Sequence, residues 1–196
     1  MCRLIESIKF QDNQLQHIEW HNKRFNEARN RLFGMDGFLD LRQMIRIPDS
    51  LQEGVYKCRV LYGKQIETID FLPYVPKKLR TLQLVEDNEI DYTYKYENRL
   101  AFDRLLASKG QADDILIVKN GHITDTSYSN MVFFDGEKWI TPDTFLLNGT
   151  QRQHMLAKEL ITEVPVTLSD LSKFKLVKPI NAMLDFETTP SVTILF

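Results

Sequence analysis

The chain has 196 residues, of which 43% are hydrophobic and 27% are charged, and its formal net charge is −2 at pH 7. An apolar fraction near the globular average with balanced charge excludes intrinsic disorder, and the lack of excess Lys and Arg argues against a nucleic-acid partner. Two cysteines, the absence of an apolar signal-peptide core and the absence of any apolar run of about 18 residues predict a cytoplasmic protein with no membrane partner.

The N-terminal segment predicts a hairpin followed by helices. Residues 4–20 alternate loosely and turn at Asp12-Asn13, which indicates two short antiparallel strands. From His21 the apolar residues recur at helical spacing until Gly34, a typical helix stop. A weaker helix is expected over residues 39–45.

Extended segments follow. Residues 55–62 alternate cleanly and residues 66–74 make a second extended run, so we expect an antiparallel meander over residues 55–85. The proline-flanked stretch 74–78 predicts a junction between two lobes, residues 1–75 and residues 76–196. A helix is then expected from Asn98 to Lys109.

Two glycine turns are the clearest signals in the second half. Asn120-Gly121 and Asp135-Gly136 each separate two apolar segments, and a type I′ hairpin turn needs positive φ at both central residues. Successive hairpins favour an antiparallel or mixed sheet. With a helix expected from Asn148 to Leu160 and further strands near the C-terminus, the fold class is α+β.

The common catalytic motifs are missing from the sequence. There is no dinucleotide-binding glycine pattern, Walker loop, zinc-protease helix or nucleophile elbow. The four histidines lack the spacing and the cysteine partners of a metal site, so no metal is predicted, and they are expected at the surface or supporting other side chains.

The segment 147–152 leads from a turn directly into a helix. A helix N-terminus presents unpaired N–H groups and the positive end of the helix dipole, which suits an anion. Gly149 would let the backbone approach a phosphate group closely, and Thr150 adds a hydroxyl. The alternative is an ordinary loop in which Asn148 or Thr150 caps the helix.

Three single residues complete the candidates. Lys95 stands among three tyrosines, where desolvation would lower the pKa of its amine; otherwise it is a surface lysine. Asp125 lies in a strand-forming run and could pair with a protonated ring nitrogen, or face solvent. Arg24 follows His21 by one helical turn, which is common for exposed arginines.

Five blocks of the sequence, in order, resemble the class IV aminotransferases, the fold-type-IV pyridoxal-phosphate enzymes. They are similar to the family's His-x-x-Arg-Leu helix motif, its lysine segment, its long strand-turn-strand stretch, its Thr-Pro and Leu-Pro-Gly-Ile-Thr-Arg signature, and a late Asn-Ala segment. The blocks are residues 21–25, 95–100, 112–133, 141–152 and 181–183. The resemblance spans residues 5–185 and implies a two-lobed α+β enzyme.

The resemblance implies the roles of two reactive groups. Lys95 would be joined covalently to pyridoxal 5′-phosphate and would later move a proton between the substrate Cα and the cofactor C4′. Asp125 stands where the family has glutamate and would pair with the pyridine N–H⁺. Because aspartate is one methylene shorter, this contact needs a closer strand or a bridging water.

The resemblance also implies a phosphate site and a substrate contact. Arg24 would contact the cofactor phosphate, and the N–H groups of Thr150 and Gln151 after Gly149 would cradle it. Residues 150–151 differ from the family's Ile-Thr. Arg59 lies on a strand where branched-chain members carry an arginine that meets the substrate carboxylate.

The function implied is therefore a pyridoxal-phosphate enzyme acting on a small amino compound. Lys95-x-x-Asn98-Arg99 is closest to aminodeoxychorismate lyases, whereas Arg59 favours a transaminase. Because the chain begins where the family already has a Phe-Glu-Thr strand, the substrate pocket is expected to differ most. The family's site lies at a subunit interface, which implies a homodimer. The alternatives are a non-catalytic binder of pyridoxal phosphate or another small ligand with the same fold, and an α+β module without cofactor.

Overall fold

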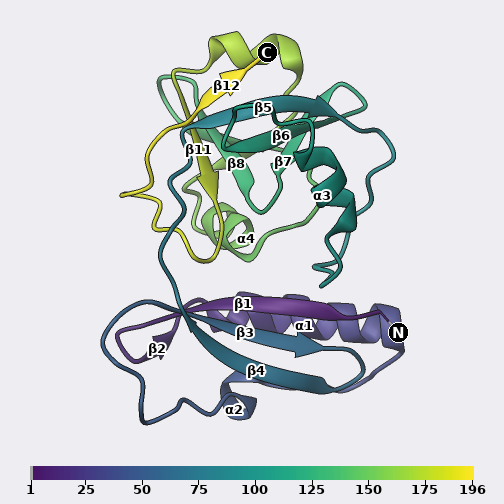
Figure 1. Cartoon of the computed structure of the whole chain (residues 1–196), viewed down its shortest axis with the longest axis vertical. Helices are drawn as coiled ribbons and strands as arrows, with labels where there is room; N and C mark the ends of the chain where they lie inside the picture. Colours follow the sequence, from purple (N-terminus) through teal and green to yellow (C-terminus); the bar gives the residue numbers. More distant parts are fainter. Residues whose placement is uncertain (1) are drawn as a thin grey trace. The chain divides into compact units, whose positions relative to one another are not determined.

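The computed structural model describes residues 2–196, and the chain divides into two compact units (Figure 1). The N-unit comprises Met1–Pro76 and Tyr94–Asn98, and the C-unit comprises Lys77–Thr93 and Arg99–Phe196. The division falls within the predicted junction. The N-unit also includes residues 94–98, which the predicted lobe of residues 1–75 leaves out.

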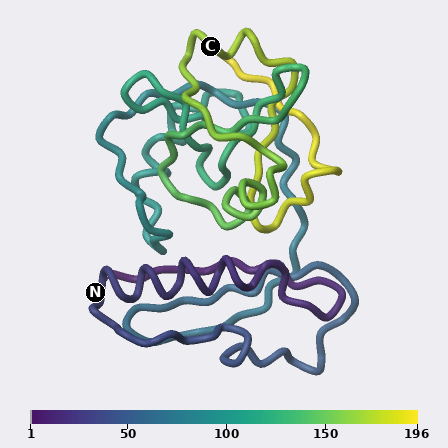
Figure 2. Tube along the Cα trace, turned by 180° about the vertical axis from the view of Figure 1, so that it is seen from behind, coloured from purple at the N-terminus to yellow at the C-terminus, as the bar shows by residue number. Residues whose placement is uncertain are grey.

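The N-unit is an antiparallel sheet with a helix along one face. The strand order is β2-β1-β3-β4, and α1 lies along the sheet (Figures 1 and 2). The elements are β1 (Leu4–Gln11), β2 (Gln14–Leu15), α1 (Ile18–Phe33), α2 (Leu41–Met44), β3 (Tyr56–Tyr62) and β4 (Ile66–Pro73).

Alternation in β1 builds the core of this unit. Because successive strand residues point to opposite faces, Leu4, Glu6, Ile8 and Phe10 form one buried row. The apolar members of this row belong to one cluster with Phe25 of α1 or stack on aromatic neighbours. Glu6 is the one charged residue in the row.

Two predicted features of the N-unit are confirmed, the turn at Asp12-Asn13 and the end of the first helix at Gly34. Asp12 and Asn13 both have positive φ, 53° and 58°, as a type I′ turn requires. Helix α1 starts at Ile18, earlier than predicted, after the left-handed His17. It ends at Gly34, whose left-handed conformation lets its N–H reach the carbonyl of residue 30.

Residues 94–98 extend the N-unit sheet beside β1. Ile5 N donates to Lys95 O at 2.9 Å, and Glu97 N donates to Arg3 O at 2.9 Å. Tyr96 forms an antiparallel bridge with Leu4, and its ring packs against the N-unit core. The lysine segment is therefore fixed to β1 by backbone hydrogen bonds on both sides of Tyr96.

The C-unit contains two mixed sheets whose side chains share a buried core. Their strand orders are β12-β5-β6-β7 and β10-β9-β8-β11, and β12–β5, β5–β6 and β9–β10 are parallel pairs. A buried cluster joins side chains of both sheets, including Leu82, Leu116 and Phe133. The elements are β5 (Thr81–Glu86), α3 (Leu100–Leu106), β6 (Asp114–Lys119), β7 (His122–Thr126), β8 (Asn130–Phe134), β9 (Trp139–Pro142), α4 (Thr150–Ala157), β10 (Thr162–Val164), the 3₁₀ helix η1 (Leu168–Lys173), β11 (Leu176–Ile180) and β12 (Thr193–Leu195).

One expectation about pairing and one about loop length were wrong. The third strand of the predicted meander, β5, belongs to the C-unit and pairs in parallel with β6, because alternation within a strand does not specify its partner. The hairpin at Asp135 has a longer loop, since β8 ends at Phe134 and β9 begins at Trp139. The side chain of Asp135 accepts the N–H groups of residues 137 and 138 across this loop.

The remaining predictions hold with shifted boundaries. Asn120 and Gly121 adopt φ of 51° and 76°, so the first hairpin has the predicted turn. Helix α3 covers only part of the expected range. Strands and helices together confirm the α+β class.

Candidate active site

The predicted site residues fall into two groups, and each group belongs to one unit. The N-unit holds the candidate amine and two candidate arginines, and the C-unit holds the candidate carboxylate and the helix start. The N-unit group is Arg24, Arg59 and Lys95, and the C-unit group is Asp125, Gly149, Thr150 and Gln151.

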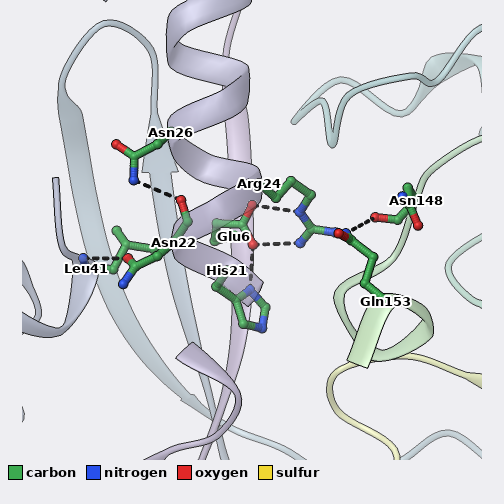
Figure 3. A network of polar contacts seen from close by, with 8 residues as sticks. All are labelled: Glu6, His21, Asn22, Arg24, Asn26, Leu41, Asn148 and Gln153. Atoms are coloured by element: carbon green, nitrogen blue, oxygen red, sulfur yellow. Dashed lines mark hydrogen bonds and ion pairs between the residues drawn. The ribbon is translucent and has the colours of Figure 1, made fainter. Parts of the chain in front are cut away.

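A buried carboxylate lies at the centre of the N-unit group. Glu6 has no exposed surface, and its Oε2 accepts hydrogen bonds from His21 Nδ1 at 2.6 Å and Arg24 Nη2 at 2.6 Å (Figure 3). Its Oε1 accepts a third, from Arg24 Nε at 2.9 Å. Burial raises the pKa of Glu6, but the charge of Arg24 and the hydrogen bonds from His21 and Arg24 outweigh it and lower the pKa to about 2.

The local sequence explains this arrangement. Glu6 belongs to the inward row of β1, and His21 and Arg24 are three residues apart, so they share one face of α1. Burial lowers the pKa of His21 in spite of its bond to Glu6, which makes the ring neutral at pH 7. Since an ionised carboxylate can only accept, we assign the hydrogen of the neutral ring to Nδ1.

Lys95 acts electrostatically on the same group. Its positive charge is one of the causes that lower the pKa of His21, after burial and the charge of Arg24. The amine of Lys95 therefore lies close enough to His21 for its charge to act on the imidazole ring, and His21 shares the acceptor Glu6 with Arg24. The N-unit thus brings Lys95, His21, Glu6 and Arg24 into one electrostatic system.

Arg59 already holds a carboxylate in this structure. Its Nη2 donates to Glu97 Oε1 at 3.0 Å, and the side chains of Arg59 and Glu97 are 26% and 34% exposed. Arg3 lies 3.7 Å from the other oxygen of Glu97 and 2.9 Å from Glu67. A substrate carboxylate that binds Arg59 would have to replace or share Glu97, which lies two residues after Lys95.

Asp125 is the buried carboxylate of the C-unit. It is 5% exposed, its Oδ1 accepts from Asn130 Nδ2 at 2.8 Å, and its Oδ2 accepts from Leu146 N at 3.0 Å and Leu147 N at 2.9 Å. Burial raises the pKa of Asp125 to about 6 although these hydrogen bonds lower it. A carboxylate has about four acceptor positions, so a position on Oδ1 remains for one more donor.

Asn130 links Asp125 to the loop before α4. Its Nδ2 also donates to Leu147 O at 2.8 Å. A Cβ at position 149 would lie 2.1 Å from Asn130 Oδ1, so any side chain at Gly149 would displace this amide. The φ of Gly149 is −65°, which means that close packing, and not an unusual backbone conformation, requires glycine here.

Helix α4 begins directly after this glycine. Gly149 is the N-cap, and no side chain caps the helix, so the alternative of an Asn148 or Thr150 cap was wrong. Gln153 N donates to Gly149 O at 3.0 Å, and Thr150 and Gln151 are the first two residues of this first turn. They therefore lie at the positive end of the helix dipole.

Sequence reasoning missed the residues that hold these groups in place. Glu6 could have been found, because a charge in an otherwise apolar inward row is unusual. Asn130 carries no such signal. Arg152, 2% exposed, donates to Asn148 Oδ1 at 3.3 Å and Pro142 O at 2.9 Å, and pairs with Glu163, which fixes the loop from inside.

The comparisons with known proteins identify the family. The amino-transferase class IV family model matches residues 73–186. An uncharacterized protein of Haemophilus influenzae is 35% identical over 185 residues, covering 93% of this chain and 98% of that protein. The chain therefore belongs to the class IV aminotransferase family, which confirms the resemblance found in the sequence and the prediction of an enzyme of this class.

Solved structures share the fold over nearly the whole of this chain. A Haemophilus somnus protein named “putative 4-amino-4-deoxychorismate lyase” is 30% identical, with a TM-score of 0.86 over 93% of this chain and 97% of that chain. A putative amino-acid aminotransferase from Mesorhizobium loti is 20% identical, with a TM-score of 0.83 over 100% of both chains. A hypothetical aminotransferase from Mycobacterium tuberculosis in its PLP-bound form is 16% identical, with a TM-score of 0.77 over 98% of this chain and 81% of that chain. The fold-type-IV prediction is thus confirmed.

No helix within residues 2–196 combines the length and the apolar character needed to cross a membrane.

Proposed function

We propose that the protein is a pyridoxal-phosphate enzyme that releases 4-aminobenzoate from 4-amino-4-deoxychorismate. The observation that carries the proposal is the 30% identical Haemophilus somnus structure of that name, which the chain matches over nearly its full length. The Lys95-x-x-Asn98-Arg99 segment supports the same reaction. The pairing of Arg59 with Glu97 weakens the argument for an amino-acid transaminase.

The side chains fit the chemical groups of pyridoxal phosphate. A phosphate dianion is bound by a guanidinium and by N–H groups at a helix start, which are the properties of Arg24 and of Thr150 and Gln151. A protonated pyridine nitrogen suits Asp125, because its raised pKa and remaining acceptor position favour a cationic donor. Lys95 supplies the amine.

These residues define what the chain itself contributes to the reaction. Bound pyridoxal phosphate supplies an electron sink that stabilises negative charge on the substrate carbon next to nitrogen. Arg24 would hold the phosphate end, Asp125 would stabilise the protonated ring nitrogen by accepting a hydrogen bond from it, and the amine of Lys95 would take and return the proton. The last role requires the amine to be neutral when it takes the proton.

The first experiment tests the cofactor and the lysine. The purified protein should show a visible absorption band that borohydride abolishes, and Lys95→Ala should lose the band while keeping its far-UV circular dichroism. Lys109→Ala, in the C-unit, is the matched control and should keep the band. A colourless protein that takes up no added pyridoxal phosphate would contradict the proposal.

The second experiment identifies the reaction. Formation of 4-aminobenzoate from 4-amino-4-deoxychorismate supports the lyase. Conversion of the visible band by a panel of amino acids supports a transaminase instead, for which the position of Arg59 on β3 is the specific argument. A protein that binds the cofactor and is inert in both assays would be a non-catalytic binder of the same fold.

We further propose that the protein is a homodimer acting on a small amino substrate, as the family resemblance implies. Light scattering coupled to size-exclusion chromatography tests this, and a monomeric mass at all concentrations would contradict it. The cytoplasmic location stays a prediction from the sequence.

A further inference from the structure

Glu6 is the least expected charge in the N-unit. It lies between Leu4 and Ile8 in the inward row of β1, and all three side chains have no exposed surface. A buried ion pair is weak evidence for stability, because well-packed apolar residues of similar volume often stabilise a protein as much or more. The arrangement of Glu6 therefore calls for a role in addition to stability.

The geometry of the Glu6–Arg24 pair fixes the direction of the guanidinium. The two carboxylate oxygens meet Nε and Nη2, which form the side edge of the planar group. Two parallel hydrogen bonds to a planar group fix both its plane and its rotation within that plane. Of the five N–H donors of arginine, two are directed to Glu6 and the other three lie on the terminal nitrogens, of which Nη1 points away from Glu6.

His21 holds the carboxylate from a second direction. Its Nδ1–H donates to the same Oε2 that Arg24 Nη2 contacts, and the ring is fully buried. Glu6 therefore cannot rotate about its terminal bond without breaking hydrogen bonds to two different residues. The side chain of Arg24 is only 12% exposed, so the guanidinium has little room for another orientation.

We propose that Glu6 is a positioning residue whose carboxylate, held by His21, aims the guanidinium of Arg24 at a phosphate group and so sets the preference of the protein for phosphorylated over unphosphorylated pyridoxal. The inference rests on the proposed function, in which Arg24 contacts the cofactor phosphate. Glu6 touches neither cofactor nor substrate in this role and acts only through Arg24.

The test is a thermodynamic cycle with two ligands. Dissociation constants of pyridoxal 5′-phosphate and of pyridoxal are measured by absorbance titration for the wild type, Glu6→Gln, Arg24→Gln and the double variant. A glutamine side chain has one acceptor oxygen and one donor group, so in Glu6→Gln it cannot satisfy both Nε and Nη2 of Arg24. We expect Glu6→Gln to lower the ratio of the affinity for pyridoxal 5′-phosphate to the affinity for pyridoxal about tenfold, with pyridoxal binding nearly unchanged. In the Arg24→Gln protein the same substitution should not change this ratio further.

The control separates positioning from a general loss of packing. Cys58 is fully buried and lies opposite Ile8 in the same apolar core. Cys58→Ala should lower the unfolding free energy and leave the affinity ratio unchanged. Equal losses for both ligands in Glu6→Gln, or additive effects of the two substitutions on the ratio, would overturn the proposal.

A second measurement works without the cofactor. The Arg24 Nε–H signal in ¹⁵N NMR should exchange slowly in the wild type and respond to inorganic phosphate, and both properties should weaken in Glu6→Gln. A wild type that binds neither form of pyridoxal would end the proposed function. The phosphate titration would then still decide the role of Glu6, since an unchanged response in Glu6→Gln would overturn it.

Discussion

The two units each bury one carboxylate, and the two behave in opposite ways. Glu6 of the N-unit is 0% exposed and Asp125 of the C-unit is 5% exposed, and each accepts three hydrogen bonds from the protein. The pKa of Glu6 is nevertheless lowered to about 2, whereas that of Asp125 is raised to about 6. Neither burial nor the number of hydrogen bonds explains the difference.

The difference comes from the charge of the donors. Two of the bonds to Glu6 come from the guanidinium of Arg24, whose full positive charge offsets the cost of burial. The donors to Asp125 are amide groups, and the charge of Arg152 is the smallest of the named causes that lower its pKa. Glu6 is therefore neutralised by a charged partner within its unit, whereas the hydrogen-bond donors of Asp125 carry no full charge.

The largest expected effect is the loss of stability when Glu6 is removed from its pair with Arg24. Glu6→Ala leaves Arg24 and His21 without their shared acceptor, and removing one partner of a buried ion pair costs about 3–5 kcal/mol. Urea unfolding measures this loss. Ser7→Ala, on the opposite face of β1, is the matched control and should change stability by less than about 0.5 kcal/mol. If Glu6→Ala lowers the free energy of unfolding no more than the control does, Glu6 is not part of a strongly coupled ion pair.

The next effect is the pH dependence of stability at Asp125. A folded pKa raised from 3.8 to about 6 means that the folded state holds its proton longer, so stability falls as the pH rises from about 4 to 6. The size of the fall is about 3 kcal/mol at 1.36 kcal/mol per pKa unit. Asp125→Asn should remove this part of the profile.

The control for that profile is the exposed Asp143, where substitution by Asn should leave the fall between pH 4 and 6 in place. Glu6 changes stability with pH in the opposite direction. Its lowered pKa adds stability that is present above about pH 4.5 and is lost as the pH falls toward 2. Identical profiles for Asp125→Asn and the wild type would show that Asp125 is not the group that titrates.

The smallest effect extends the comparison to a more exposed pair. Glu97→Gln removes the partner of Arg59, and because both side chains are partly exposed, stability should change by less than about 1 kcal/mol. If Arg59 receives a substrate carboxylate, the same substitution should lower the KM for that substrate several-fold, since it removes a competitor. Steady-state kinetics with Glu67→Gln as control decides this, and an unchanged KM would remove Arg59 from the substrate site.

The sequence predicted those features that depend on neighbouring residues. The Asp12-Asn13 and Asn120-Gly121 turns, the end of α1 at Gly34 and the helix start after Gly149 all follow from backbone chemistry that a few residues determine. The family motifs supplied the candidate site in the same local way.

The features that the sequence did not predict depend on distant partners. The pairing of β5 with β6, and not with β4, is a choice between sheets that alternation cannot make. The clamp on Arg24 requires β1 and α1 to pack face to face, and the contact of Asn130 with Gly149 requires β8 to lie beside the loop before α4. Each depends on tertiary packing, which carries no short sequence signature.

Residues 94–98 belong to the N-unit although the residues before and after them belong to the C-unit, and this has a consequence for how the protein is made. A ribosome completes Pro76 before it reaches this segment, so the nascent N-unit lacks its edge segment, including Lys95, until Asn98 has left the exit tunnel. No single cut of the gene separates two complete halves. Recombination that exchanges one unit between relatives would need three crossovers, after residues 76, 93 and 98, so the two units are most simply inherited together.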